Sequence, residues 1–273
     1  MSGNLTRYVD AWEQTIRSVA ELAEGLSPAD WDRATECPGW SVRDNVSHVI
    51  GLERELLGDP APSHTLPRDL VHIRNEMGRY MEIAVDVRRH HTPAELVGEL
   101  NDTIARRVKA LREEVERRDP EEEVEVFGGL RRWTYEILLR NRAFDVWVHE
   151  QDIRRAVGRP GNLGAPAALA AKDVIVSALP VVVVKRAGAP AGSAVIFDVT
   201  GPVKFSAVVR VDTDGRGVLS PWLFGDPTAR LTMDWETFAR LGCGRVSPRT
   251  VHVTVQGDEE LAGRVLDAMA VTP

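Results

Sequence analysis

The stretch GRPG, residues 158–161, separates two parts of the chain with different sequence patterns. Gly158 is typical of the left-handed residue that ends a helix, and the proline that follows cannot continue one. Before this stretch, long segments lack the alternation of strands, and after it short β-branched runs appear. The sequence therefore predicts two domains, a helical one over residues 1–160 and an α+β one over residues 161–273.

Helix-start signals recur through the first part. SPAD at 27–30 and TPAE at 92–95 each place proline at the first helical position, behind a Ser or Thr cap and ahead of an acidic residue. SVRD at 41–44 is a weaker start of the same kind. We expect helices near residues 5–24, 41–57, 68–90, 93–118 and 131–157. The acidic DPEEEVEV at 119–126 is expected to be a solvated loop.

The second part begins with an alanine-rich apolar helix and continues with β-branched runs. SAVIFDV, VKFSAVVRV, ARLTM and TVHVTVQG are typical of strands, and DTDG at 212–215 predicts a hairpin-type turn between two of them. A closing helix is expected behind a cap at Asp258. The apolar AALAAKDVIVSALPVVVV contains Lys172, Asp173 and Pro180, so we expect it to pack in a core rather than to span a membrane.

Composition and charge limit the classes of function. The chain has 273 residues, 43% hydrophobic and 27% charged, which is typical of a soluble globular protein. Its net charge of -7 disfavours nucleic acid and anionic membranes as partners, because like charges repel. The two cysteines, Cys37 and Cys243, lie too far apart in the sequence to indicate a disulfide framework. The beginning of the chain does not resemble a secretory signal, so we expect a cytoplasmic protein.

The stretch FDVWVHEQD, residues 144–152, contains the first candidate site. Asp145 and His149 are four residues apart, so they lie on one face of the predicted helix. A carboxylate and an imidazole with this spacing can share one divalent cation, but for an isolated pair a simple ion pair is the commoner arrangement. His48 is the candidate third ligand, because it lies at the flank of the buried stripe of its own helix.

Two further acidic residues occupy informative positions. Asp152, three residues after His149, either orients an imidazole or forms a salt bridge to Arg155 or Arg142, and we favour the orienting role. Glu53 falls within the apolar stripe of its helix, where an unpaired charge is unfavourable. We therefore expect Glu53 to be the structural partner of an arginine.

Three further residues, Cys37, Trp40 and His72, are given no catalytic or binding role by the sequence. Trp40 is expected to be a packing residue rather than a surface that binds substrate. Cys37 has no base next to it in the sequence, so we interpret it as a small buried residue. His72 gives no local signal for or against a function.

Two motifs resemble those of a known family. CPGWSVRDNVSHVIGLE, residues 37–53, resembles the P-x-W-[ST]-V-R-D-x-x-x-H signature of the mycothiol-dependent maleylpyruvate isomerase family. DVWVHEQDIRRAVGRP, residues 145–160, resembles its second signature, E-x-x-x-H-x-x-D. The C-terminal DPTARLTMDWETFARLGCGR and VTVQGDEELAGRVLDAM are similar to its last domain. The resemblance implies an all-α, DinB-like four-helix bundle followed by an α+β, sterol-carrier-like domain.

The resemblance also implies a site. The metal ligands of the family fall on His48, Asp145 and His149, and Asp145 stands where the family usually has glutamate. The implied cofactor is a divalent metal, with zinc preferred and nickel or iron as alternatives, and the implied thiol cosubstrate is mycothiol. Three protein ligands would leave one position open, as in catalytic zinc sites.

The implied activity is that of an isomerase or S-transferase acting on a small electrophilic, maleylpyruvate-like substrate. Such an acid needs a cation, and Arg245 in LGCGR is our candidate, because guanidinium binds carboxylate in a bidentate manner. A surface arginine near a turn is an equally good interpretation of Arg245. Two other classes stay open: a metal-binding protein without enzymatic activity, and a carrier of apolar ligands.

Overall fold

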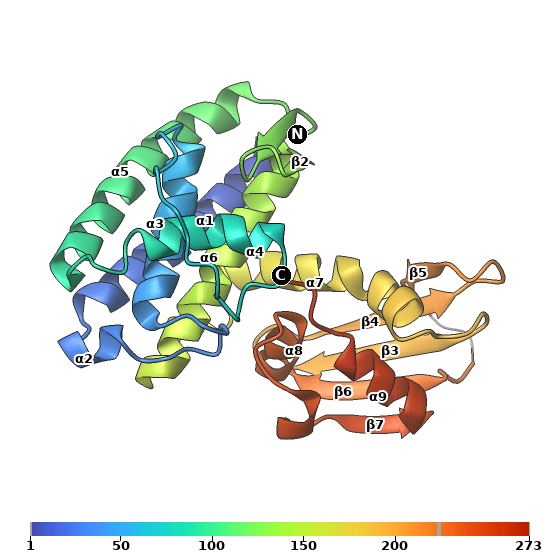
Figure 1. Cartoon of the computed structure of the whole chain (residues 1–273). Coiled ribbons are helices and arrows are strands. Elements are labelled where there is room, and N and C mark those ends of the chain that lie inside the picture. The colour runs from blue at the N-terminus through green and yellow to red at the C-terminus, as the bar shows by residue number, and fades with distance from the viewer. Residues whose placement is uncertain (1, 223–224, 273) are drawn as a thin grey trace. The chain divides into compact units, whose positions relative to one another are not determined.

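The computed structural model describes residues 2–222 and 225–272, which divide into two compact units (Figure 1). Unit 1 extends to Ala170, and unit 2 covers Ala171–Thr272. The helix α7 (Pro166–Val181) contains the point of division. Each unit has its own arrangement of helices and strands.

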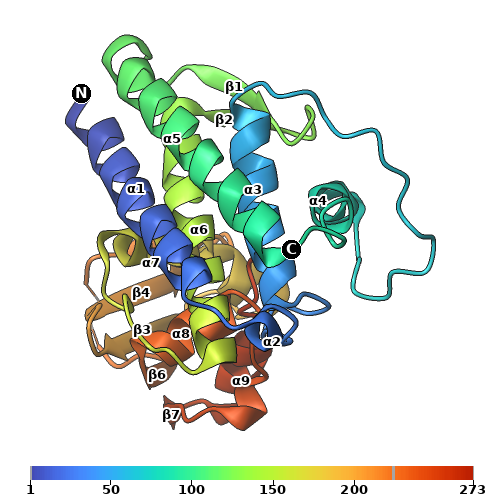
Figure 2. The same ribbon diagram turned by 90° about the vertical axis from the view of Figure 1, so that its left-hand side faces the viewer.

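Unit 1 is built on four long helices (Figure 2). They are α1 (Ser2–Glu24), α3 (Val42–Leu56), α5 (Pro93–Arg117) and α6 (Tyr135–Val157). α1 and α3 each pack against both α5 and α6. Large side chains on these helices, such as Trp12, Ile50 and Trp147, are buried, so the apolar faces of the helices contribute to a core. The predicted helical bundle is confirmed.

Side-chain caps explain where these helices begin. Ser41 accepts a hydrogen bond from the backbone nitrogen of Asp44, whose carboxylate accepts one from the backbone nitrogen of Ser41 at 2.9 Å. Thr92 and Glu95 form the same reciprocal pair, with the carboxylate 2.7 Å from the backbone nitrogen of Thr92. These interactions satisfy amide groups that have no partner within the helix. Gly158, at φ 66°, ends α6 in the left-handed conformation, as predicted.

The segment between α5 and α6 differs from the prediction. Residues expected to be a solvated loop and a helix start instead form a two-stranded antiparallel sheet, β1 (Glu123–Val126) and β2 (Arg131–Thr134), and α6 begins only at Tyr135. Val126 is buried, and Phe127 adopts a positive φ in the turn. The acidic composition of β1 did not indicate a strand. Its stabilising contacts come from pairing with β2, which the composition of β1 alone does not reveal.

The helix predicted over residues 68–90 is shorter in the structure. The described residues 57–75 contain no helix, and α4 (Glu76–Asp86) begins behind Asn75, whose side chain accepts a hydrogen bond from the Gly78 nitrogen at 2.8 Å. Figure 2 shows α4 beside α3 after this long connection. A short helix, α2 (Pro28–Trp31), precedes α3, with Ser27 as its N-cap and Pro28 as its first residue, as predicted.

Unit 2 contains a five-stranded sheet in the order β5-β4-β3-β6-β7. The strands are β3 (Ala194–Thr200), β4 (Phe205–Val211), β5 (Gly217–Ser220), β6 (Ala229–Asp234) and β7 (Thr254–Gly257). β3 and β6 are parallel, and the other neighbours are antiparallel. The predicted turn at 212–215 joins β4 to β5. The predicted α+β architecture is confirmed.

Besides residues 171–181 of α7, unit 2 contains further helical elements. They are η1 (Val182–Arg186), α8 (Trp235–Gly242), η2 (Pro248–Thr250) and α9 (Glu259–Asp267). α8 contacts β3 and β6, and α9 contacts β6 and β7 (Figure 1). Asp258 caps α9, as predicted, by accepting a hydrogen bond from the Leu261 nitrogen at 2.9 Å.

The apolar segment at the start of unit 2 packs partly in the core of that unit. Pro166–Arg186 is long and apolar enough to cross a membrane, but the buried core helix of a soluble protein can have the same length and composition. Ile175 and Leu179 are completely buried. Ile175 lies so close to Gly242 of α8 that a Cβ there would come within 2.8 Å of it. The segment therefore contributes core side chains to unit 2.

Candidate metal centre

Two helices of unit 1 bring the predicted ligands together. His48 lies in the second turn of α3, and Asp145 and His149 lie one turn apart on α6, which packs against α3. Oδ2 of Asp145 is 3.3 Å from Nε2 of His48, and Oδ1 is 3.7 Å from Nε2 of His149. One ligand atom from each residue lies within 4.8 Å of the other two. The three side chains can therefore reach a single cation.

The cluster is buried on the histidine side and open on the carboxylate side. His48 and His149 are 3% and 4% exposed, whereas the Asp145 side chain is 28% exposed. A small molecule coming from solvent would therefore meet Asp145 before the imidazoles.

Asn45 determines which nitrogen of His149 carries the proton. Nδ2 of Asn45 donates to the Ser41 carbonyl oxygen at 2.8 Å, which fixes the orientation of the amide. Its Oδ1 lies 2.6 Å from Nδ1 of His149, so Nδ1 must be the donor. When the ring is neutral, Nε2 presents its lone pair on the side of Asp145 and is available to a metal. Sequence reasoning missed Asn45, although it lies three residues before His48 on the same helix.

His48 has unsatisfied polar atoms at the centre of the cluster. Both ring nitrogens are buried, and among the residues that the structure describes neither makes a contact with hydrogen-bond geometry, although Nε2 lies 3.3 Å from Oδ2 of Asp145. Buried polar atoms of this kind are rare and call for a ligand or a bound ion. Burial lowers the pKa of His48, so the ring is neutral near pH 7 and able to donate a lone pair. These properties fit a metal ligand.

His149 has a different electrostatic environment. Burial opposes the charged form of the ring, but the carboxylates of Asp145 and Asp152 outweigh it and raise the pKa of His149. Oδ2 of Asp152 lies 3.4 Å from Nδ1 of His149, and its Oδ1 accepts a hydrogen bond from Arg155 at 2.9 Å. Asp152 thus makes both contacts that the sequence suggested.

Asp145 is held by a buried ion-pair network. Nη1 of Arg142 lies 3.0 Å from Oδ2 of Asp145, and its Nε donates to Glu53 at 2.9 Å. Arg107 and Trp12 donate to the same Glu53 carboxylate at 3.1 and 2.8 Å. The prediction that Glu53 pairs with an arginine is confirmed. Burial alone would raise the pKa of Asp145, but Arg142 and the two imidazoles hold it well below its ordinary value, so the carboxylate is ionised.

The prediction that Cys37 is buried was wrong. Cys37 is partly exposed, and one ligand atom each from Cys37, His149 and Asp152 lie within 4.8 Å of one another. Nδ1 of His149 is committed to Asn45, however, and Asp152 is paired with Arg155. This second group is therefore a poorer metal site than the cluster around Asp145. The turn that precedes α3, which the sequence does not place near α6, brings Cys37 close.

Trp40 packs against the candidate ligands. Its ring centroid lies 4.8 Å from that of His48 and 5.6 Å from that of His149. Trp40 makes packing contacts, as expected, but the residues against which it packs are those of the site. Its position next to Ser41, the N-cap of the helix that carries His48, was the sequence feature that could have indicated this proximity.

Arg245 belongs to unit 2 and is not among the residues that unit 1 brings together. It follows α8, is partly buried, and its Nη1 donates to the Cys243 carbonyl oxygen at 2.8 Å. Its proposed contact with substrate stays a prediction.

The fold and the cluster define a class of protein: a helical bundle that holds two histidines and one aspartate around a common point, followed by an α+β unit. Residues 12–154 match the family model described as the mycothiol maleylpyruvate isomerase N-terminal domain, and residues 170–264 match the MDMPI C-terminal domain. The chain belongs to the mycothiol maleylpyruvate isomerase family.

Solved structures share this fold. Two crystal structures of mycothiol-dependent maleylpyruvate isomerase, one of them a histidine-to-alanine mutant, align with TM-scores of 0.55 and 0.56. Their sequence identities are 15% and 14%, and each alignment covers 92% of both chains. At this identity the likeness establishes the shared fold. A search of curated proteins gave no match.

Proposed function

We propose that this protein is a metal-dependent, thiol-using isomerase or S-transferase of the cytoplasm, acting on a small electrophilic acid similar to maleylpyruvate. The observation that carries the proposal is the convergence of His48, Asp145 and His149 in a member of this family. The buried ring nitrogens of His48, neither of which makes a hydrogen bond of good geometry, support a bound ion, and the exposure of Asp145 supports access for small molecules. Mycothiol is the thiol that the family name indicates.

His48, Asp145 and His149 would hold the metal, and zinc suits two imidazoles and one carboxylate, with nickel or iron as alternatives. A divalent metal in this position supplies Lewis acidity, which lowers the pKa of a thiol at neutral pH. Arg142 already offsets the charge of Asp145, so the charge of a divalent ion would be largely uncompensated by the protein. Such a site favours anionic ligands, and a thiolate is one.

The residues around the ligands would keep the site in the reactive arrangement. Asn45 keeps the proton of His149 on Nδ1, Asp152 supports the same side of the ring, and Arg142 fixes the Asp145 carboxylate. A thiolate can add to an electron-poor double bond, which then rotates as a single bond before the thiol leaves. Displacement of a leaving group by the same thiolate would be the transferase reaction.

The proposal is tested by elemental analysis of the purified protein together with a thiol-conjugation screen. We expect about one zinc ion per chain and metal-dependent consumption of mycothiol or isomerisation of a maleylpyruvate-like acid. Loss of turnover on chelation, with recovery on adding metal back, would support the assignment. Stoichiometric metal without any turnover would favour a metal-binding protein, and an apolar ligand without metal would favour a carrier.

Arg245 is proposed to bind the substrate carboxylate. Replacing it with alanine should lower kcat/KM by about 10- to 100-fold, because a hydrogen bond to a charged group contributes about 1.5–3 kcal/mol. The metal content should not change, because Arg245 is not a proposed ligand. Arg249→Ala, which removes an exposed arginine of the same unit, is the matched control. Equal kinetics for both variants would remove Arg245 from the proposed site.

A further inference from the structure

Trp40 covers the candidate ligands from the side of the turn that precedes α3. Its indole ring is tilted by 43° to the ring of His48 and by 38° to that of His149. Trp40 is partly exposed, whereas both imidazoles are buried. A molecule that approaches the imidazoles would therefore meet the indole as well as Asp145.

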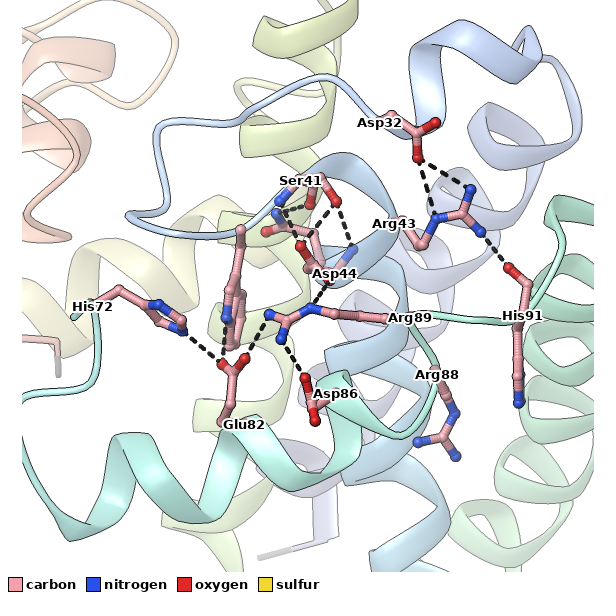
Figure 3. Close-up of polar contacts among 12 residues, drawn as sticks. Asp32, Ser41, Arg43, Asp44, His72, Glu82, Asp86, Arg88, Arg89 and His91 are labelled. Carbon is pink, nitrogen blue, oxygen red and sulfur yellow. Dashed lines mark hydrogen bonds and ion pairs between the residues drawn. The ribbon is translucent and has the colours of Figure 1, made fainter. Parts of the chain in front are cut away.

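Glu82 holds the indole through its ring nitrogen. Nε1 of Trp40 donates to Oε2 of Glu82 at 2.9 Å, and Glu82 is only 1% exposed. Nη2 of Arg89 lies 2.5 Å from the other carboxylate oxygen, and Nε2 of His72 lies 2.9 Å from Oε2. Figure 3 shows His72 and Arg89 approaching Glu82 from opposite sides. A buried carboxylate with three such partners has little freedom to move.

His72 also fixes the turn that carries Trp40. A Cβ atom on Gly39 would lie 2.4 Å from Cγ of His72, so the imidazole packs directly on the backbone next to Trp40. Gly39 has a φ of +80°, which a larger residue adopts only with strain. The connection between α3 and α4 is thus attached both to Glu82 and to the Gly39 backbone. Two independent contacts restrain the position of the indole.

We propose that Trp40 is the wall of the candidate site against which the planar, conjugated part of the electrophile lies, and that Glu82 and His72 are positioning residues that hold this wall over His48 and His149. An aromatic face suits a flat unsaturated molecule, because both surfaces are apolar and complementary in shape. The inference rests on the proposed function for the identity of the ligand. The positions of Trp40, Glu82 and His72 do not depend on it.

The first test asks whether Trp40 lies over a bound metal. Cobalt(II), which quenches indole emission at short range, is added to metal-free wild-type protein and to Trp40→Phe. We expect cobalt to quench the part of the emission that Trp40→Phe lacks. If both proteins bind cobalt stoichiometrically and that part of the emission is unchanged, the placement of Trp40 is wrong. If the wild type binds no cobalt, the proposed function fails instead.

The second test needs no metal, so it separates the two proposals. Glu82→Ala and His72→Ala should increase the acrylamide quenching of Trp40, measured against Trp40→Phe, and shift its emission to the red. His64→Ala is the matched control, because His64 contacts Asp86 on the same helix at 2.6 Å from the same connection. Glu82→Gln keeps an acceptor for the indole and should restore most of the protection. Equal quenching in all variants would overturn the positioning role.

Turnover supplies the last comparison. Misplacement of a substrate-positioning group by about 1 Å can reduce activity by about 100-fold, so Glu82→Ala should reduce kcat/KM for the electrophile by about 10-fold or more. Metal content should stay at the wild-type level, because Glu82 is not a ligand. Unchanged kinetics for a planar electrophile in Trp40→Ala would contradict the proposed wall.

Discussion

Replacing His48 or His149 with alanine is expected to abolish stoichiometric metal binding. Each substitution removes one of three protein ligands, and the two that remain cannot hold a divalent ion against dialysis. Both side chains lie within the bundle, whose core consists mainly of apolar residues, so we expect the helices to remain. Elemental analysis after dialysis measures the metal, and far-UV circular dichroism checks the fold.

His90→Ala is the control for this experiment, because His90 is exposed and lies outside the cluster. Asp145→Asn should weaken metal binding, because an amide is a poorer ligand than a carboxylate. The substitution keeps the size of the side chain and one acceptor oxygen. Full metal content in both histidine variants would show that the cluster is an ion pair and not a metal site.

Glu53→Ala is expected to have the largest effect on stability. The substitution leaves the guanidinium groups of Arg107 and Arg142 buried without the carboxylate that both of them contact. Removing one partner of a buried ion pair typically costs about 3–5 kcal/mol. We therefore expect a loss of this size in the free energy of unfolding, measured by urea denaturation of the full chain followed by circular dichroism.

Asp102→Ala provides the comparison for Glu53→Ala. The Asp102 side chain is 63% exposed and lies 3.7 Å from Arg106, so its loss should change the free energy of unfolding by less than about 1 kcal/mol. Similar losses in both variants would mean that the buried network contributes no more than a surface pair. Glu53→Ala should also reduce metal binding, because Arg142 would no longer be fixed beside Asp145.

Short-range interactions made much of the fold predictable. The caps at Ser27, Thr92 and Asp258 each act within three residues of the helix start, so the sequence alone indicates them. The same holds for the one-turn spacing of Asp145 and His149, which follows from helix geometry. The β1–β2 hairpin was missed because its stability depends on pairing across strands, which an acidic segment does not reveal.

The sequence by itself indicated most of the helices and strands, the order of the two units, and three candidate ligands on two helices. The tertiary structure decided that Asp145 pairs with Arg142, that Asn45 orients His149, and that Glu82 holds the indole of Trp40. Trp40 and Glu82 are 42 positions apart, and His149 and Asn45 are 104 apart. Helix periodicity shows which face of a helix is apolar. It does not show which helix will pack against that face, or how the two helices are shifted along their axes. Contacts between polar side chains depend on both, because a hydrogen bond is lost when its atoms move apart by about 1 Å.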